Sequence, residues 1–342
     1  MFEPKYLISA KLLENIKKIT TLIFELNSRP FPKVVLMELL KSAHEVSAYA
    51  STSIEGNPLP LTDVKILLKN HPRQLRDSER EVLNYNKALI WLDALLEKKN
   101  QKFDLKLILD VHKTVVQGLL PPSRSGKIRQ EAVFVNDPQL RRTVYWPPDH
   151  QNMSTLMQDL FDFVYKNQKK VDPLILAGIF HKQFVVIHPF MDGNGRTVRL
   201  ATKVLLSAMG LNTFKLFSFE NYYNQNVTKY FEKVGVKGNY YDECKDIDFT
   251  PWLEYFTDGI IDELLRVSKI LSQKSITPST ILKSHHQKIL NYLKNHDFIT
   301  DSLYATLTER KKPTRNQDFN RLIDVVLIEM VGNGKATIYR MK

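Results

Sequence analysis

Cysteine and glycine are both scarce in this sequence of 342 residues. The single cysteine, Cys244, has no partner within the chain for a disulfide, and one thiol is too few for a cysteine-based metal site. Disulfide scaffolds and zinc ribbons are therefore excluded, and a reducing compartment is expected. Because there are only twelve glycines, the pair Gly193 and Gly195 marks a place where the backbone needs unusual freedom.

Long apolar runs are lacking as well. The longest, such as residues 173–180, are far shorter than the roughly 18 residues that cross a bilayer. The first residues carry Glu3 and Lys5 and lack the apolar core of a signal peptide. We therefore expect a cytoplasmic protein with no membrane span.

Acidic residues are outnumbered by basic ones. The chain has 49 Lys and Arg against 37 Asp and Glu, which gives a formal net charge of +12 at pH 7. This excess favours a polyanionic partner, such as nucleic acid, nucleotide phosphates or an acidic protein surface. Charge alone does not choose among them.

Helical periodicity extends over most of the chain. In residues 36–50 and 153–164, for example, apolar side chains recur at spacings of three and four. Residues 132–146 differ, because β-forming residues at 133–135 and 143–145 flank a turn-rich segment at 136–138, which predicts a hairpin. We expect a mainly α protein, a helical bundle with one β-hairpin.

Three regions are predicted along the chain: a helical N-terminal region (1–99), a central core (100–274) and a tail (275–342). The tail begins with a Ser/Thr/Pro-rich stretch at 275–284 and continues with a helix from His285 and a strand pair around residues 332–334. Helices followed by a glycine-containing hairpin resemble a winged helix. The tail is basic, so it is the candidate site for a nucleic-acid partner.

The segment IHPFMDGNGRTVRL, residues 187–200, joins two apolar helical runs and is expected to be a loop that enters a helix. Gly193 and Gly195 let several backbone N–H groups point at one place, next to the positive end of the following helix, which makes an anion cradle. Arg196 and Arg199 are spaced i, i+3 and reach the same side of that helix, where they can bind a polyphosphate.

Two further residues of this segment have chemical roles. Asp192 is placed to hold a Mg²⁺ ion that polyphosphates bring with them, because Mg²⁺ prefers carboxylate and phosphate oxygens. His188 is the one titratable group near the cradle with a pKa suited to a general base at neutral pH.

Residues 188–199, HPFMDGNGRTVR, match the Fic-domain signature HPFx(D/E)GNGRxxR at every specified position, and the chain thus resembles the Fic family. Fic proteins are mostly adenylyltransferases that move AMP from ATP to a hydroxyl side chain of a target protein, themselves included. The resemblance implies a role for each matching residue: His188 as the base, Asp192 as the Mg²⁺ ligand, Gly193 and Gly195 as the anion-binding backbone, Asn194 at the α-phosphate, Arg196 at the β-phosphate, Arg199 at the γ-phosphate and Phe190 as a structural residue.

Other stretches extend the resemblance over about the first 260 residues. Residues 51–57, STSIEGN, fit the inhibitory motif (S/T)xxxE(G/N) through Ser51, Glu55 and Gly56, and their place ahead of the core resembles the class with an N-terminal inhibitory helix. Residues 126–129, GKIR, lead into the hairpin and resemble the family's flap, which docks a target segment by strand addition. A phosphotransferase branch has lysine at the position of Gly195, so the resemblance favours AMP transfer.

Two alternatives stay open. Some family members remove AMP from a modified protein, and the sequence does not settle the direction. In a different class, the protein is a transcriptional regulator whose tail binds DNA and whose Fic core senses nucleotide. The sequence also leaves open whether the chain forms a homodimer.

Several other residues are interpreted as structural. His181 is expected to be a packed core histidine, His285 and His286 solvated helix residues, and residues 309–315 (ERKKPTR) a solvated loop. An aromatic cluster follows the core, and packing is its favoured role; it comprises Tyr222, Tyr223, Tyr230, Phe231, Tyr240 and Tyr241.

Overall fold

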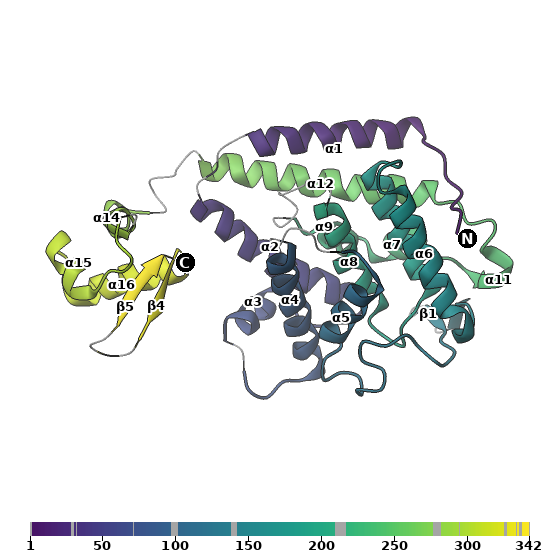
Figure 1. Cartoon of the computed structure of the whole chain (residues 1–342), viewed down its shortest axis with the longest axis horizontal. Helices are drawn as coiled ribbons and strands as arrows, with labels where there is room; N and C mark the ends of the chain where they lie inside the picture. Colours follow the sequence, from purple (N-terminus) through teal and green to yellow (C-terminus); the bar gives the residue numbers. More distant parts are fainter. Residues whose placement is uncertain are drawn as a thin grey trace. The chain divides into compact units, whose positions relative to one another are not determined.

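The computed structural model is mainly helical, as expected (Figure 1). It describes residues 2–28, 31, 33–70, 72–96, 102–137, 142–208, 217–275, 282–293, 295–324, 327–332, 334 and 337–341. The chain forms two compact units, Met1–Ser28 with Ser42–Arg266, and Arg29–Lys41 with Val267–Lys342. The three-region division of the sequence stays a prediction.

The first unit contains most of the helices and a small sheet. Two helices belong to both units: α2 (Lys33–Ile54) enters the first unit at Ser42, and α12 (Thr250–Ser275) leaves it after Arg266. The other elements are α1 (Ala10–Ser28), α3 (Leu61–Asn70), α4 (Asp77–Leu96), α5 (Leu105–Val115), β1 (Val135–Asp137), β2 (Arg142–Trp146), the 3₁₀ turn η1 (His150–Asn152), α6 (Met153–Asn167), α7 (Pro173–Ile187), α8 (Asn194–Ala208), α9 (Phe219–Gln225), α10 (Val227–Val234), β3 (Gly238–Asn239) and α11 (Tyr240–Glu243).

Helix α7 is the centre of this unit. Its N-terminus is capped by Asp172, whose carboxylate accepts from the Leu174 N–H, and Pro173 occupies the first turn, where no N–H is needed. Nearly all of its residues are buried, as expected for a helix that is apolar on every side. It packs against α6 and α8.

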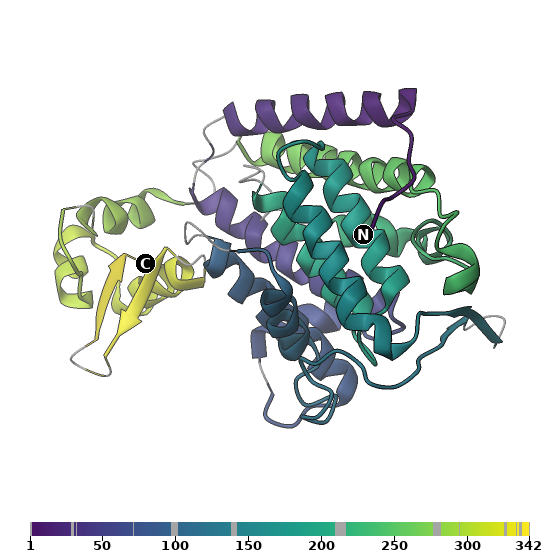
Figure 2. The same ribbon diagram turned by 45° about the vertical axis from the view of Figure 1, so that its right-hand side comes forward.

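Helix α1 lies along the first part of α12 (Figure 1, Figure 2). The contact includes polar pairs: Asn15 donates to Asp258 at 2.8 Å, and Lys11 pairs with the same carboxylate at 2.7 Å. Among the described helices, none has the combined length and apolar character that crossing a membrane requires.

The predicted hairpin is present, but its first strand begins later than expected. β1 starts at Val135 and includes Asn136 and Asp137, which were assigned to the turn; residues 138–141 lie outside the described part. β1 is antiparallel to β2, with an irregularity between Val135 and Asn136, and β3 is parallel to β2. Tyr145 anchors the hairpin, because its hydroxyl donates to the Val186 carbonyl of α7 at 2.9 Å.

The second unit has the predicted order of helices followed by a hairpin. Its elements, besides the ends of α2 and α12, are α14 (Ser284–Leu293), α15 (Asp301–Leu307), α16 (Lys312–Asp324), β4 (Ile328–Val331) and β5 (Ile338–Met341). The strands are antiparallel, and Ile299, just before α15, forms a bridge to Tyr339 of β5. Tyr339 also stacks on Phe319 of α16 at 3.9 Å, which joins the hairpin to the helices.

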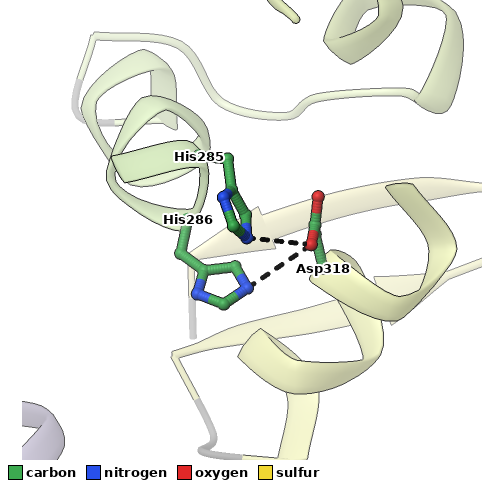
Figure 3. A group of neighbouring side chains, drawn as sticks. All are labelled: His285, His286 and Asp318. Carbon is green, nitrogen blue, oxygen red and sulfur yellow. Dashed lines mark ion pairs between the residues drawn. The ribbon is translucent and has the colours of Figure 1, made fainter. Parts of the chain in front are cut away.

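The prediction that His285 and His286 are solvated is wrong, because both rings face Asp318 (Figure 3). His286 is buried, and the Nε2 atoms lie 3.2 and 3.5 Å from Asp318 Oδ1. Imidazole and carboxylate are metal-ligand types, but here Arg310 binds both oxygens of Asp318, at 2.7 and 3.0 Å, and Tyr304 donates at 2.9 Å. Since a guanidinium already compensates the carboxylate, we read the cluster as a structural ion-pair network.

Residues 309–315 are likewise not a solvated loop throughout. Besides Arg310, Arg315 is engaged, with hydrogen bonds of 2.8 Å from Nε and Nη2 to the two oxygens of Asp301. Helix α16 also begins within this run, at Lys312. Arg310 and Arg315 of this run therefore form ion pairs within the second unit.

Candidate active site

His188 ends α7 in a left-handed backbone conformation. Its φ of 53° is the one positive φ among the described residues other than glycine. Nδ1 lies 3.3 Å from the Val185 carbonyl, so we assign the proton to Nδ1, which leaves Nε2 as an acceptor. Burial lowers the pKa of His188, against an opposing effect of the Val185 hydrogen bond. The imidazole is therefore neutral near pH 7 and able to accept a proton.

The loop after His188 is closed by Asn194. Its side-chain amide accepts from the Phe190 N–H at 2.9 Å and donates to the Phe190 carbonyl at 2.8 Å. Gly193 has a φ of +78°, and a Cβ there would lie 2.8 Å from the Val116 side chain, so both conformation and space require glycine. Asn194 thus shapes the loop, and its predicted contact with the α-phosphate stays a prediction.

Arg196 and Asp192 face one another at the first turn of α8. Arg196 donates from Nη2 to Asp192 Oδ2 and from Nη1 to Glu81 of α4, both at 2.9 Å. Its Nε is buried and without a partner in the described part of the chain. The Asp192 side chain is 54% exposed, so a half-open carboxylate stands where Mg²⁺ was predicted, and oxygen ligands of this kind fit that ion. Glu81 was missed in the sequence because no local pattern links it to the loop.

Arg199 is fully buried and bound to the end of α2. Its guanidinium donates from Nε to Ser51 Oγ at 2.7 Å, and from Nη2 to the Ser51 carbonyl at 2.8 Å and to Glu55 Oε1 at 2.7 Å. A Cβ at Gly195 would collide with Glu55 Oε1, so the carboxylate lies directly on the glycine of the cradle. Gly56 then turns the chain away with a φ of +92°. The structure brings the two separate motifs of the sequence together at one place.

Comparison with known proteins agrees with this geometry. Residues 102–206 match the sequence model of the Fic/DOC family. The chain contains a Fic domain. It is 28% identical over 201 residues to protein adenylyltransferase Fic of Nematostella vectensis, covering 58% of this chain and 45% of that protein. It is 32% identical over 174 residues to protein adenylyltransferase Fic of Aedes aegypti, covering 50% and 33%. The chain thus spans less than half the length of these relatives.

Solved structures show the same fold. A Fic family protein from Desulfovibrio desulfuricans G20 has a TM-score of 0.64 at 20% identity, with 100% of this chain and 98% of that chain covered. Fic-1 of C. elegans has a TM-score of 0.61 at 21% identity, with 78% and 74% covered. At these identities the likeness concerns the fold alone.

A polar seam holds α2 against the Fic helix α8. Ser47 and Ser51 lie one turn apart on α2, and Glu55, at the same spacing of four, follows directly after the last residue of the helix, Ile54. One turn of α8 after Arg199, Lys203 donates to Ser47 Oγ at 2.7 Å and pairs with the buried Glu220 at 3.0 Å. Since buried polar groups are costly to leave unpaired, the seam fixes the register of α2 and thereby the place of Glu55.

The aromatic cluster divides into core and surface. Tyr223 and Tyr230 are buried and stack at 4.7 Å, whereas Phe231 and Tyr241 are 46% and 47% exposed. His181 is a core residue, as predicted: Nδ1 lies 2.9 Å from the Thr202 hydroxyl and Nε2 lies 3.2 Å from the Tyr230 hydroxyl. These contacts occupy both ring nitrogens.

His112 of α5 is a site residue that no pattern in the sequence indicates. Its ring stacks on Phe190 at 3.7 Å, Nδ1 accepts from the Gly126 N–H at 3.0 Å, and Nε2 lies 3.0 Å from the Asp192 carbonyl. The first bond requires an unprotonated Nδ1 and the second a proton on Nε2, which fixes the neutral tautomer. Burial lowers the pKa of His112 to about 4.

We expect the protein to lose stability in mild acid through His112. The unfolded chain binds the proton with an ordinary pKa near 6.5, so the stabilisation is complete above that pH and is lost as the pH falls toward 4. The lowered pKa of His112 corresponds to a loss of about 3 kcal/mol at most in the free energy of unfolding. Urea unfolding of wild type and His112→Gln between about pH 7 and pH 5 measures it. A variant with the same pH slope as wild type would contradict this role; a shallower slope supports it.

Proposed function

We propose that this protein is an adenylyltransferase that moves AMP from ATP to a hydroxyl side chain of a protein, itself included, and that Glu55 restrains it. The observation that carries the proposal is the convergence of a neutral His188, a half-open Asp192 carboxylate and two arginines on one glycine turn. The Nematostella and Aedes relatives, both named protein adenylyltransferase Fic, support the same activity.

The reaction follows from what each residue can bind. His188 Nε2 accepts the proton of the target hydroxyl, whose oxygen attacks the α-phosphorus; the bond from that phosphorus to the bridging oxygen breaks, and pyrophosphate leaves. Arg196 and Arg199 offer guanidinium groups to the β- and γ-phosphates, and Gly195 leaves room for them at the start of α8. Asp192 would hold a Mg²⁺ ion, which would neutralise charge on the phosphates.

The restraint follows from the ion pair. Glu55 pairs with Arg199 and fills the space over Gly195. The γ-phosphate of an ATP that enters the site therefore lacks its contact with Arg199. A misplacement of about 1 Å at the α-phosphorus costs on the order of a hundredfold in rate. The resting protein is therefore expected to transfer AMP slowly.

The hairpin is proposed to present the target. β1 pairs with β2 alone among the described strands, so it has an edge at which an extended segment can add as a further strand. That addition is proposed to carry the target hydroxyl toward His188.

The proposal is tested with ATP labelled in either the α- or the γ-phosphate and the Glu55→Gly variant of the full chain. Label from the α-phosphate alone, with pyrophosphate released, is expected. Label from the γ-phosphate would assign phosphate transfer instead, and loss of AMP from a modified protein without any incorporation would assign AMP removal. Retarded DNA migration with steep salt dependence and no labelling would favour the regulator.

A further inference from the structure

We propose that Arg129 is a positioning residue that holds His188 and the two ends of the hairpin segment in one fixed arrangement. The inference rests on the proposed function for its catalytic meaning. Arg129 lies between α5 and β1, within the GKIR stretch, and is 3% exposed. It is not in the loop of residues 188–199 and touches none of the cradle's phosphate-facing side chains in the described contacts.

The contacts of Arg129 join three pieces of backbone. Nε donates to the His188 carbonyl at 2.9 Å, and the Arg129 backbone N–H donates to the Pro189 carbonyl at 2.9 Å. Nη1 donates to the Glu131 carbonyl at 2.9 Å, and Nη2 donates to the Pro148 carbonyl. Glu131 precedes the hairpin and Pro148 follows it. One planar guanidinium therefore binds the histidine turn and both ends of the hairpin segment.

The histidine turn needs this support. A non-glycine residue in the left-handed region costs roughly 1–2 kcal/mol and persists only when its surroundings hold it there. Arg129 binds the carbonyls of both His188 and Pro189, so it fixes the peptide whose orientation sets the direction of the imidazole. The bond to Pro189 comes from the backbone of residue 129, so it is the side-chain bond to the His188 carbonyl whose loss is expected to leave Nε2 without a defined position.

The burial of Arg129 argues against a role in packing alone. Every hydrogen bond of its guanidinium among the described residues goes to a backbone carbonyl oxygen, and the one carboxylate that favours its charge, Asp149, acts on it without a hydrogen bond. Burying a cation in this way is costly, and burial accordingly lowers the pKa of Arg129. An apolar side chain would fill the space at lower cost, but only the guanidinium fork reaches three carbonyls in one plane.

The consequence for catalysis is geometric. A target segment added to the hairpin places its hydroxyl relative to the hairpin backbone, whereas His188 is placed by the end of α7. The Arg129 side chain hydrogen-bonds to both, and so fixes the position of the hairpin relative to His188. We infer that it acts on the rate of proton and AMP transfer and leaves ATP binding to the cradle.

The test compares Arg129→Lys with its parent, both in the Glu55→Gly background of the full chain. Lysine keeps the charge, but its single nitrogen cannot take the places of Nε, Nη1 and Nη2, each of which donates to a different carbonyl. We expect kcat for self-modification to fall on the order of tenfold to a hundredfold, with an unchanged dissociation constant for ATP. Arg124→Ala is the matched control: Arg124 lies in the same segment but is 42% exposed and binds the Glu131 side chain at 2.8 Å, so its removal is expected to leave kcat as in the parent.

A second measurement follows His188 directly. In the NMR spectrum of histidine-labelled protein, the His188 ring signal, assigned by its loss in His188→Ala, is expected to shift or broaden in Arg129→Lys and not in Arg124→Ala. An unchanged kcat together with an unchanged ring signal overturns the proposal, as does a loss of ATP affinity in proportion to kcat. If the Glu55→Gly parent transfers no AMP, the proposed function fails, and the ring signal alone decides whether Arg129 positions His188.

Discussion

Replacing Glu55 with glycine is expected to raise the rate of AMP transfer on the order of tenfold to a hundredfold. The carboxylate pairs with the buried Arg199 at 2.7 Å and lies on Gly195, so its removal frees both the guanidinium and the space for the outer phosphates. The measurement is the initial rate of α-phosphate incorporation at saturating ATP. A rate equal to or below that of wild type would remove the restraint from this account.

Two variants serve as controls for that result. Glu55→Gln keeps the side chain's bulk but not its charge, so an intermediate rate is expected if charge and space both matter. Glu45→Ala removes an acid within α2, ten residues before Glu55, and is expected to leave the rate unchanged.

The Glu55→Gly substitution leaves the buried Arg199 without the carboxylate it pairs with, which destabilises the protein in the absence of ATP. ATP is therefore expected to raise the melting temperature of Glu55→Gly more than that of wild type.

Replacing His188 with alanine in the Glu55→Gly background is expected to lower AMP transfer by about 10²- to 10⁴-fold, the range typical of a lost general base. Affinity for ATP should be retained, because the phosphates are bound by the cradle and the arginines and not by the imidazole. Calorimetric titration with a non-hydrolysable ATP analogue measures the affinity, and incorporation of the α-label measures the rate. Full transfer by the double variant would show that another group accepts the proton.

The cradle was predictable from the sequence because its parts are contiguous. Two glycines, an acid and two arginines within eight residues meet whatever the rest of the chain does, since a tight turn into a helix is a local structure. The inhibitory motif was recognisable only by resemblance. Its contact with Arg199 depends on the seam through Ser47 and Lys203, which packing creates between residues about 150 positions apart.

The supporting residues of the site had no such local signal. Glu81, His112 and Arg129 come from three separate segments, and each contacts the loop through a backbone carbonyl or a single side chain. In the sequence, Glu81 and His112 are an ordinary helix acid and helix histidine, and Arg129 is marked only as part of the GKIR stretch that resembles the family's flap. Only their contacts in the folded chain distinguish them: Glu81 accepts from Arg196, and the buried His112 and Arg129 face backbone carbonyl oxygens of the loop.

The same limit explains the expectations that were wrong. His286 is polar and follows another histidine, which is typical of a solvated helix face. In the fold it is buried and faces Asp318 of α16. Asn136 and Asp137 are turn formers by composition, yet they pair with β2 because the register shifts next to Val135. In both cases a tertiary partner outweighs local preference.

The loop of residues 188–199 is proposed to bind ATP in line with His188 once the Glu55 carboxylate is removed. A crystal structure of Glu55→Gly with a non-hydrolysable ATP analogue tests this geometry. We expect phosphates over Gly193 and Gly195, Arg199 turned from its place beside residue 55 to the γ-phosphate, and His188 Nε2 on the open side of the α-phosphorus. An analogue bound away from this loop, or one whose α-phosphorus is shielded from His188 by its own phosphates, would contradict it.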